Sequence, residues 1–214
     1  WEHIKCASPG SPDQTVSALE VTNGGQGFFT SFQMPIYMME RVVSFPEAGG
    51  KVLVADACNN FGADGFSIGG WVYPLTRSTG ALESVITLTS AAGYLAVKYN
   101  GERFVVVEKV GTNGEVALGE SAAAPAHDKG EGAGWHYVLI SGDDSKLMLY
   151  VDGAEFAITA HTVSLDTCDM ELGTTSGAQK AFFGYMEEVT VWMTFLEKCD
   201  AYHLMWGNRT QEAL

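Results

Sequence analysis

The chain has 214 residues, and its 26 acidic against 12 basic side chains give a formal net charge of −14. A nucleic-acid partner needs a basic surface, so this composition argues strongly against one. No apolar run reaches the roughly 18 residues that a membrane-spanning helix requires. The chain starts at Trp1 without a methionine and shows no signal-peptide pattern, so we expect a processed product or a piece of something larger.

Residues 1–40 differ in character from the rest of the chain. Pro9, Gly10 and Pro12 indicate an irregular start, and 16–21 and 28–33 are plausible strands. We predict that this segment is the tail of a preceding domain, a lead-in, or an edge extension of the main domain. The main domain then comprises residues 41–214.

From residue 41 onward, apolar residues such as Phe66, Ile68 and Val72 recur with a period of two, which is the pattern of β-strands. Asn100-Gly101 between two apolar runs is a strong hairpin signal. Residues 121–134 are expected to form a loop, and only 196–206 to form a helix. The expected strands are 42–45, 51–54, 66–73, 84–89, 94–99, 103–110, 135–152 with a break at 142–145, 155–158, 170–173 and 181–193. These elements predict an all-β fold, an antiparallel two-sheet jelly-roll sandwich with one short C-terminal helix.

Three sequence blocks occur in a fixed order, namely FSIGGWVYP at 66–74, WHYVLISGDDSKLMLYVDG at 135–153 and FFGYMEEVTVW at 182–192. They match the patterns F-T-I-x-x-W-V-x-P, W-H-h-V followed by a turn and L-x-L-Y-V-D-G, and F-x-G-x-I-D-E-V-x-V/I-W/Y. In these blocks the chain resembles the laminin-G-like modules of the concanavalin A-like lectin/glucanase superfamily, particularly the pentraxin-like branch, over about 42–207. The resemblance implies a jelly roll, and the functions it allows are lectin, adhesion module, glycan-binding accessory domain or glycosidase.

The carboxylates and the serine motif favour a non-catalytic domain. G-x-S-x-G at 65–69 places Ser67 inside a strand, whereas a nucleophile elbow needs a sharp turn between a strand and a helix. The E-x-D-x-x-E motif of the superfamily's glucanases is absent. Glu187 and Glu188 are adjacent, so strand alternation should point them to opposite faces, and Asp143-Asp144 belongs to a turn. The five histidines show no metal-binding spacing.

Calcium is the cofactor that the resemblance implies. Related modules hold Ca²⁺ with a carboxylate near the third block and with loop carbonyls, and such oxygen ligands suit this ion. Glu187 and Glu188 are therefore the candidate metal ligands. Glu187 stands where aspartate is usual, and the longer side chain would shift the ion or lose it. The alternative is a solvated acidic pair on an edge strand.

Aromatic side chains on the outward faces of the strands are the candidate ligand-binding residues. If Phe66 and its alternate neighbours face the core, then strand parity directs Trp71, Tyr73, Tyr94 and Tyr150 away from it. Exposed rings of this kind would stack on sugar rings. The alternative is that they pack in the structure, covered by residues 1–40 or by the loop 121–134.

Four cysteines without a CxxC pair disfavour zinc and indicate disulfides. Three pairings are possible and sequence alone does not distinguish them; we favour Cys168–Cys199, which implies Cys6–Cys58. Asn208 begins an N-glycosylation sequon. Together these features favour an extracellular or cell-surface setting.

Two functions follow from the sequence. The first is a non-catalytic extracellular recognition module that binds a glycan or a protein, with calcium assisting. The second is a structural or docking domain of a larger assembly that binds no small ligand.

Overall fold

The computed structural model describes residues 42–58, 61, 65–75, 82–124, 134–143, 145–174 and 180–210, and side chains up to residue 205. The predicted strands 16–21 and 28–33 and most of the predicted loop 121–134 lie outside these ranges. Thirteen strands precede one helix in the described part. They are β1 Val43–Phe45, β2 Val52–Val54, β3 Phe66–Pro74, β4 Glu83–Ser90, β5 Gly93–Tyr99, β6 Phe104–Val110, β7 Val116–Glu120, β8 His136–Gly142, β9 Leu147–Val151, β10 Ala154–Ile158, β11 Asp169–Leu172, β12 Lys180–Ala181, β13 Gly184–Trp192 and α1 Lys198–Thr210.

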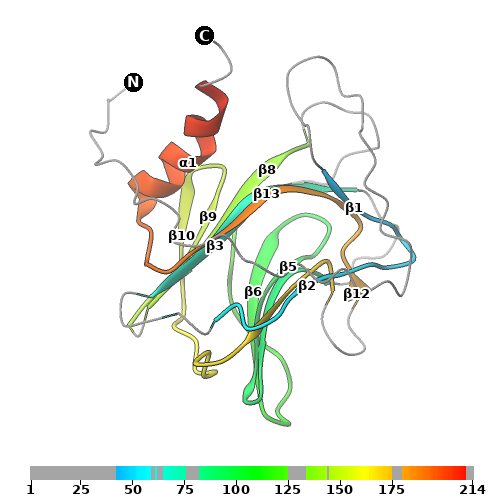
Figure 1. Cartoon of the computed structure of the whole chain (residues 1–214), viewed down its shortest axis with the longest axis vertical. Helices are drawn as coiled ribbons and strands as arrows, with labels where there is room; N and C mark the ends of the chain where they lie inside the picture. Colours follow the sequence, from blue (N-terminus) through cyan, green and yellow to red (C-terminus); the bar gives the residue numbers. More distant parts are fainter. Residues whose placement is uncertain are drawn as a thin grey trace.

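The strands form two stacked sheets, as the sequence predicts. The six-stranded sheet has the order β1-β13-β3-β8-β9-β10, and the seven-stranded sheet has the order β2-β11-β4-β5-β6-β7 with β12 paired to β4. All pairings are antiparallel except that of β12 with β4. Helix α1 lies on the outer side of the six-stranded sheet, away from the seven-stranded sheet (Figure 1). The predicted jelly-roll sandwich with a C-terminal helix is confirmed.

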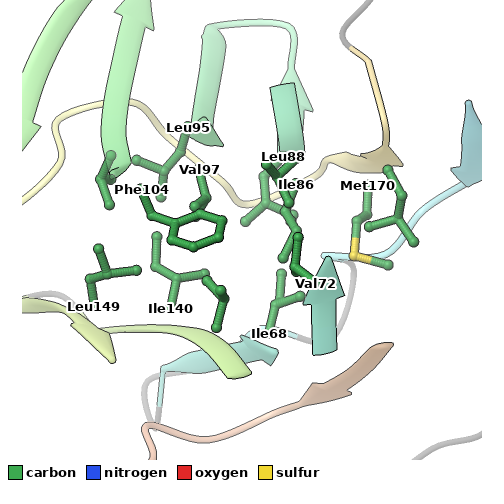
Figure 2. Close-up of a cluster of buried hydrophobic side chains, with 14 of the residues drawn as sticks. Ile68, Val72, Ile86, Leu88, Leu95, Val97, Phe104, Ile140, Leu149 and Met170 are labelled. Carbon is green, nitrogen blue, oxygen red and sulfur yellow. The ribbon is translucent and has the colours of Figure 1, made fainter. Parts of the chain in front are cut away.

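The core lies between the sheets and is filled by the alternate apolar side chains that the period of two identifies. Ile68 and Val72 of β3 point toward Leu88 of the opposite sheet, and Phe104 of that sheet points toward Ile140 of β8 (Figure 2). All five side chains are buried. A continuous apolar layer of this kind is the main stabilising contribution in a sandwich.

Two elements differ from the sequence prediction. Strand β7 was not expected, because its residues VALGE are largely exposed and show no buried alternation. It forms because β6 offers a free edge with which it pairs. Helix α1 begins two residues later than expected and extends to Thr210.

The disulfide pairing favoured from the sequence is wrong. Cys58 is bonded to Cys168, with their Cα atoms 4.9 Å apart. The physical reason is that β2 and β11 are antiparallel neighbours, so the residues that follow β2 and precede β11 come together. Cys199 is also disulfide-bonded, whereas Cys6 lies outside the described residues.

Candidate functional site

Three of the four predicted ligand-binding aromatics are buried and cannot stack on a sugar. Trp71 and Tyr150 face outward from the six-stranded sheet, as parity predicts, but they are 9% and 2% exposed because they pack in one cluster with Ala201 and Met205 of α1. Tyr73 is 1% exposed. The prediction that these rings are accessible is wrong. The alternation of a strand shows which way a side chain points, but it does not show which other elements cover that face of the sheet.

Tyr73 lies in an aromatic cluster on the same side of this sheet. Its ring contacts Trp135 and Tyr185 edge-on, with centroid distances of 5.4 and 6.0 Å. Such edge-to-face pairs stabilise packing. The outer side of the six-stranded sheet is therefore a second packing layer.

Ser67 anchors the segment that leads into α1. Its hydroxyl donates to the carbonyl of Thr194 at 2.7 Å and lies 2.7 Å from the Ser141 hydroxyl, and the Leu196 amide donates to both serine oxygens. Ser67 is fully buried inside β3, so the serine of G-x-S-x-G is a structural residue. The second glycine of the motif also has a structural explanation, because a Cβ at Gly69 would lie 2.7 Å from Leu139.

The outer side of the seven-stranded sheet has a different chemistry, and we call its central part the polar sheet face. Registered residues on neighbouring strands share a face, so the inward direction of Ile86, Leu88, Leu95 and Val97 defines the residues that point outward. The polar sheet face consists of Ser84, Thr87 and Thr89 of β4, Tyr94, Ala96 and Lys98 of β5, Val105 and Val107 of β6, Glu171 of β11, and Glu115, which comes just before β7.

A carboxylate bridges two residues of β5 on this face. Glu115 Oε2 accepts a hydrogen bond from the Tyr94 hydroxyl at 2.6 Å and another from the Lys98 ammonium group. Lys98 is fully buried, whereas the Glu115 side chain is 22% exposed. Burial raises the pKa of the Tyr94 hydroxyl, and the hydrogen bond and charge of Glu115 raise it further.

A second ion pair lies on the other side of β4. Lys51 donates to Glu171 at 3.0 Å, and the Glu171 side chain is 3% exposed. Glu171 is registered with Thr87, and Thr87 in turn with Ala96. The β4 hydroxyls therefore lie between two lysine–glutamate pairs, each of which joins one buried and one partly exposed side chain.

Three hydroxyls of β4 are the unusual feature of the polar sheet face. The oxygens of Ser84, Thr87 and Thr89 are buried and have no hydrogen-bond partner within the described part of the chain. Buried hydroxyls without a partner are rare, because leaving one unpaired costs about 1–3 kcal/mol. A ligand cannot reach these oxygens in this structure, because all three are buried and Ser84 and Thr87 are 0% exposed. The accessible part of the polar sheet face is the end at Tyr94 and Glu115, whose side chains are partly exposed.

The sequence predicted one residue of this site and missed the others. Tyr94 points outward and is partly exposed, so its assignment as a ligand residue stays a prediction. The parity of β4 and β5 could have identified Thr87 and Lys98. No sequence pattern identifies Glu115 as a site residue, because it precedes β7, the strand that the sequence does not predict.

The predicted calcium ligands lie at an irregularity of β13. The register with β3 shifts between Glu187 and Thr190, and Glu188 has a positive φ of 51°. The strict alternation assumed for the two glutamates therefore does not hold. Glu188 is close enough to Tyr137 to add to the effect of burial in raising the pKa of that hydroxyl. No group of three or more potential metal-ligating side chains occurs among the described residues, and the calcium assignment stays a prediction.

Comparison with known proteins establishes the family. The model Laminin_G_3, described as the concanavalin A-like lectin/glucanases superfamily, matches residues 46–200. The chain therefore belongs to this superfamily, which confirms the resemblance stated above. No curated protein matches the chain significantly.

Solved structures share the fold at low identity. The binding domain of botulinum neurotoxin serotype G has a TM-score of 0.64 at 12% identity, covering 89% of this chain and 46% of that one. The chain thus spans about half of that binding domain. Domain 4 of AbnA, an extracellular arabinanase from Geobacillus stearothermophilus in complex with arabinotriose, has a TM-score of 0.59 at 13% identity, covering 87% and 86%. A Trypanosoma rangeli sialidase has a TM-score of 0.54 at 14% identity, covering 78% and 28%.

Among the described helices, none has the length and apolar character needed to cross a membrane.

Proposed function

We propose that this chain is a non-catalytic module that binds a glycan on the polar sheet face. The observation that carries the proposal is the partly exposed end of this face, where the Glu115 carboxylate is held beside Tyr94 through one oxygen and leaves its other oxygen without a hydrogen bond within the described residues. A tyrosine ring can stack on the apolar side of a sugar, and a carboxylate oxygen can accept a hydrogen bond from a sugar hydroxyl. One neighbour supports the choice of ligand, because it is an arabinanase domain in complex with the neutral sugar arabinotriose.

The exposed apolar side chains favour a glycan ligand over protein docking. In the described part only Val116 and Tyr202 are large hydrophobic residues with more than a third of their surface exposed. A docking domain of a larger assembly would present a contiguous apolar patch. The polar sheet face instead presents a tyrosine and a carboxylate at its partly exposed end.

Calcium and an extracellular setting are parts of the same proposal. Glu187 and Glu188 are the proposed calcium ligands, on the basis of their position in the family motif. The Cys58–Cys168 disulfide supports an oxidising compartment. The sequon at Asn208 is consistent with that compartment.

A glycan array probed with the purified chain, in millimolar calcium and again in EDTA, tests the function. We expect binding to at least one glycan class, and we expect Tyr94→Ala to weaken it by about tenfold through the loss of the ring that contacts the sugar. Tyr202→Ala is the matched control, since Tyr202 is exposed and lies on α1, away from the seven-stranded sheet. Absence of binding to every glycan in both conditions would refute the proposal. Loss of binding in EDTA would support the calcium site, and equal binding in both conditions would remove it.

A further inference from the structure

The two oxygens of the Glu115 carboxylate have different surroundings. Oε2 accepts both internal hydrogen bonds, from Tyr94 and Lys98. Oε1 forms no hydrogen bond within the described residues, and the side chain is partly exposed. A carboxylate held in place through one oxygen leaves the other as a fixed acceptor at the surface.

Among the residues that the structure describes, the polar sheet face holds no excess of positive charge that would attract an anion. The Lys98 ammonium group is neutralised by Glu115, and that of Lys51 by Glu171. Lys109 and Asp169, which carry opposite charges, lie at opposite ends of the row of registered residues that contains Thr89 and Tyr94. The whole chain carries −14, so its long-range field also repels anions.

Resting on the proposed glycan-binding function, we infer that Glu115 makes this site selective for uncharged glycans. Its free Oε1 accepts a hydrogen bond from a sugar hydroxyl at the partly exposed end of the polar sheet face, beside Tyr94. A ligand carboxylate or sulfate in that position would face the Glu115 charge and be repelled. Tyr94 and Lys98 are positioning residues for this acceptor, because they fix its other oxygen.

The test compares neutral and acidic glycans that are otherwise alike, namely galactotriose against trigalacturonate and lactose against sialyllactose, together with an array of both classes. Binding is measured by titration calorimetry for the unmodified chain, for Glu115→Gln and for Glu155→Gln. Glu155 lies on β10 of the other sheet and is exposed, so its variant makes the same change in net charge away from the site. Circular dichroism and thermal unfolding show that each variant is folded.

We expect the unmodified chain to prefer neutral glycans, and Glu115→Gln to weaken neutral binding about tenfold or more while narrowing the gap to acidic glycans. Glu155→Gln should bind as the unmodified chain does. A preference for acidic glycans, or neutral binding that Glu115→Gln leaves intact, would overturn the inference while leaving the glycan-binding function standing. Absence of binding to any glycan would instead overturn the proposed function itself.

Discussion

Replacing Thr87 by valine should stabilise the protein and leave glycan binding unchanged. Valine has nearly the shape of threonine, so the change leaves no cavity and exchanges only the hydroxyl for a methyl group. Thr87 is fully buried, and its oxygen has no hydrogen-bond partner in the described part of the chain. The folded state therefore bears the cost of removing this hydroxyl from water without a compensating bond.

The size of the effect follows from that cost. A buried hydroxyl without a hydrogen bond lowers the free energy of unfolding by about 1–3 kcal/mol. The substitution recovers only part of this loss, because the new methyl group lies next to charged neighbours. We expect a gain of about 1 kcal/mol in the free energy of unfolding. For a domain of this size such a gain raises the Tm by about 2–4 °C.

Urea and thermal unfolding of the ligand-free protein measure the change. Thr159→Val, at an exposed position, should alter the free energy of unfolding by less than about 0.5 kcal/mol. A loss of 1 kcal/mol or more in Thr87→Val would show that the hydroxyl has a partner, which would refute the reasoning. Glycan affinity should be unchanged, because the Thr87 side chain is buried and closed to a ligand.

Three further perturbations test the packing. Replacing Cys58 and Cys168 together by alanine opens a link between residues 110 apart in the sequence and should lower the free energy of unfolding by about 4–5 kcal/mol in denaturant titrations; no loss would contradict the pairing. Burial raises the pKa of Tyr137, so its contribution to stability is complete below the unfolded pKa of about 10 and is lost as the pH rises above it. Tyr137→Phe should therefore lose less stability at alkaline pH than the unmodified chain or Tyr202→Phe does, as measured by urea unfolding across that range. Trp71→Ala should cost about 3–5 kcal/mol while the folded protein keeps its glycan affinity; the opposite pattern would restore Trp71 as a ligand residue.

The sequence by itself determined the fold class and most of the strands. Alternation such as Phe66, Ile68 and Val72 identifies a strand and its buried side, because successive side chains of a strand point to opposite faces. The Asn100-Gly101 hairpin follows from local backbone preferences, and the structure places positive φ at Gly101. Local information of this kind is enough to predict the direction in which the side chains of a strand point and the positions of turns.

The tertiary structure alone decided which surfaces are accessible and which distant residues meet. Trp71 and Tyr150 face outward as predicted, yet a helix about fifty residues beyond Tyr150 covers them. Cys58 meets Cys168 because β2 pairs with β11, a contact that no spacing reveals. Glu115 reaches Lys98 because β7, which Glu115 precedes, pairs with β6, and β6 pairs with β5. Each of these contacts joins segments far apart in the chain, and a one-dimensional pattern carries no record of which strand lies next to which.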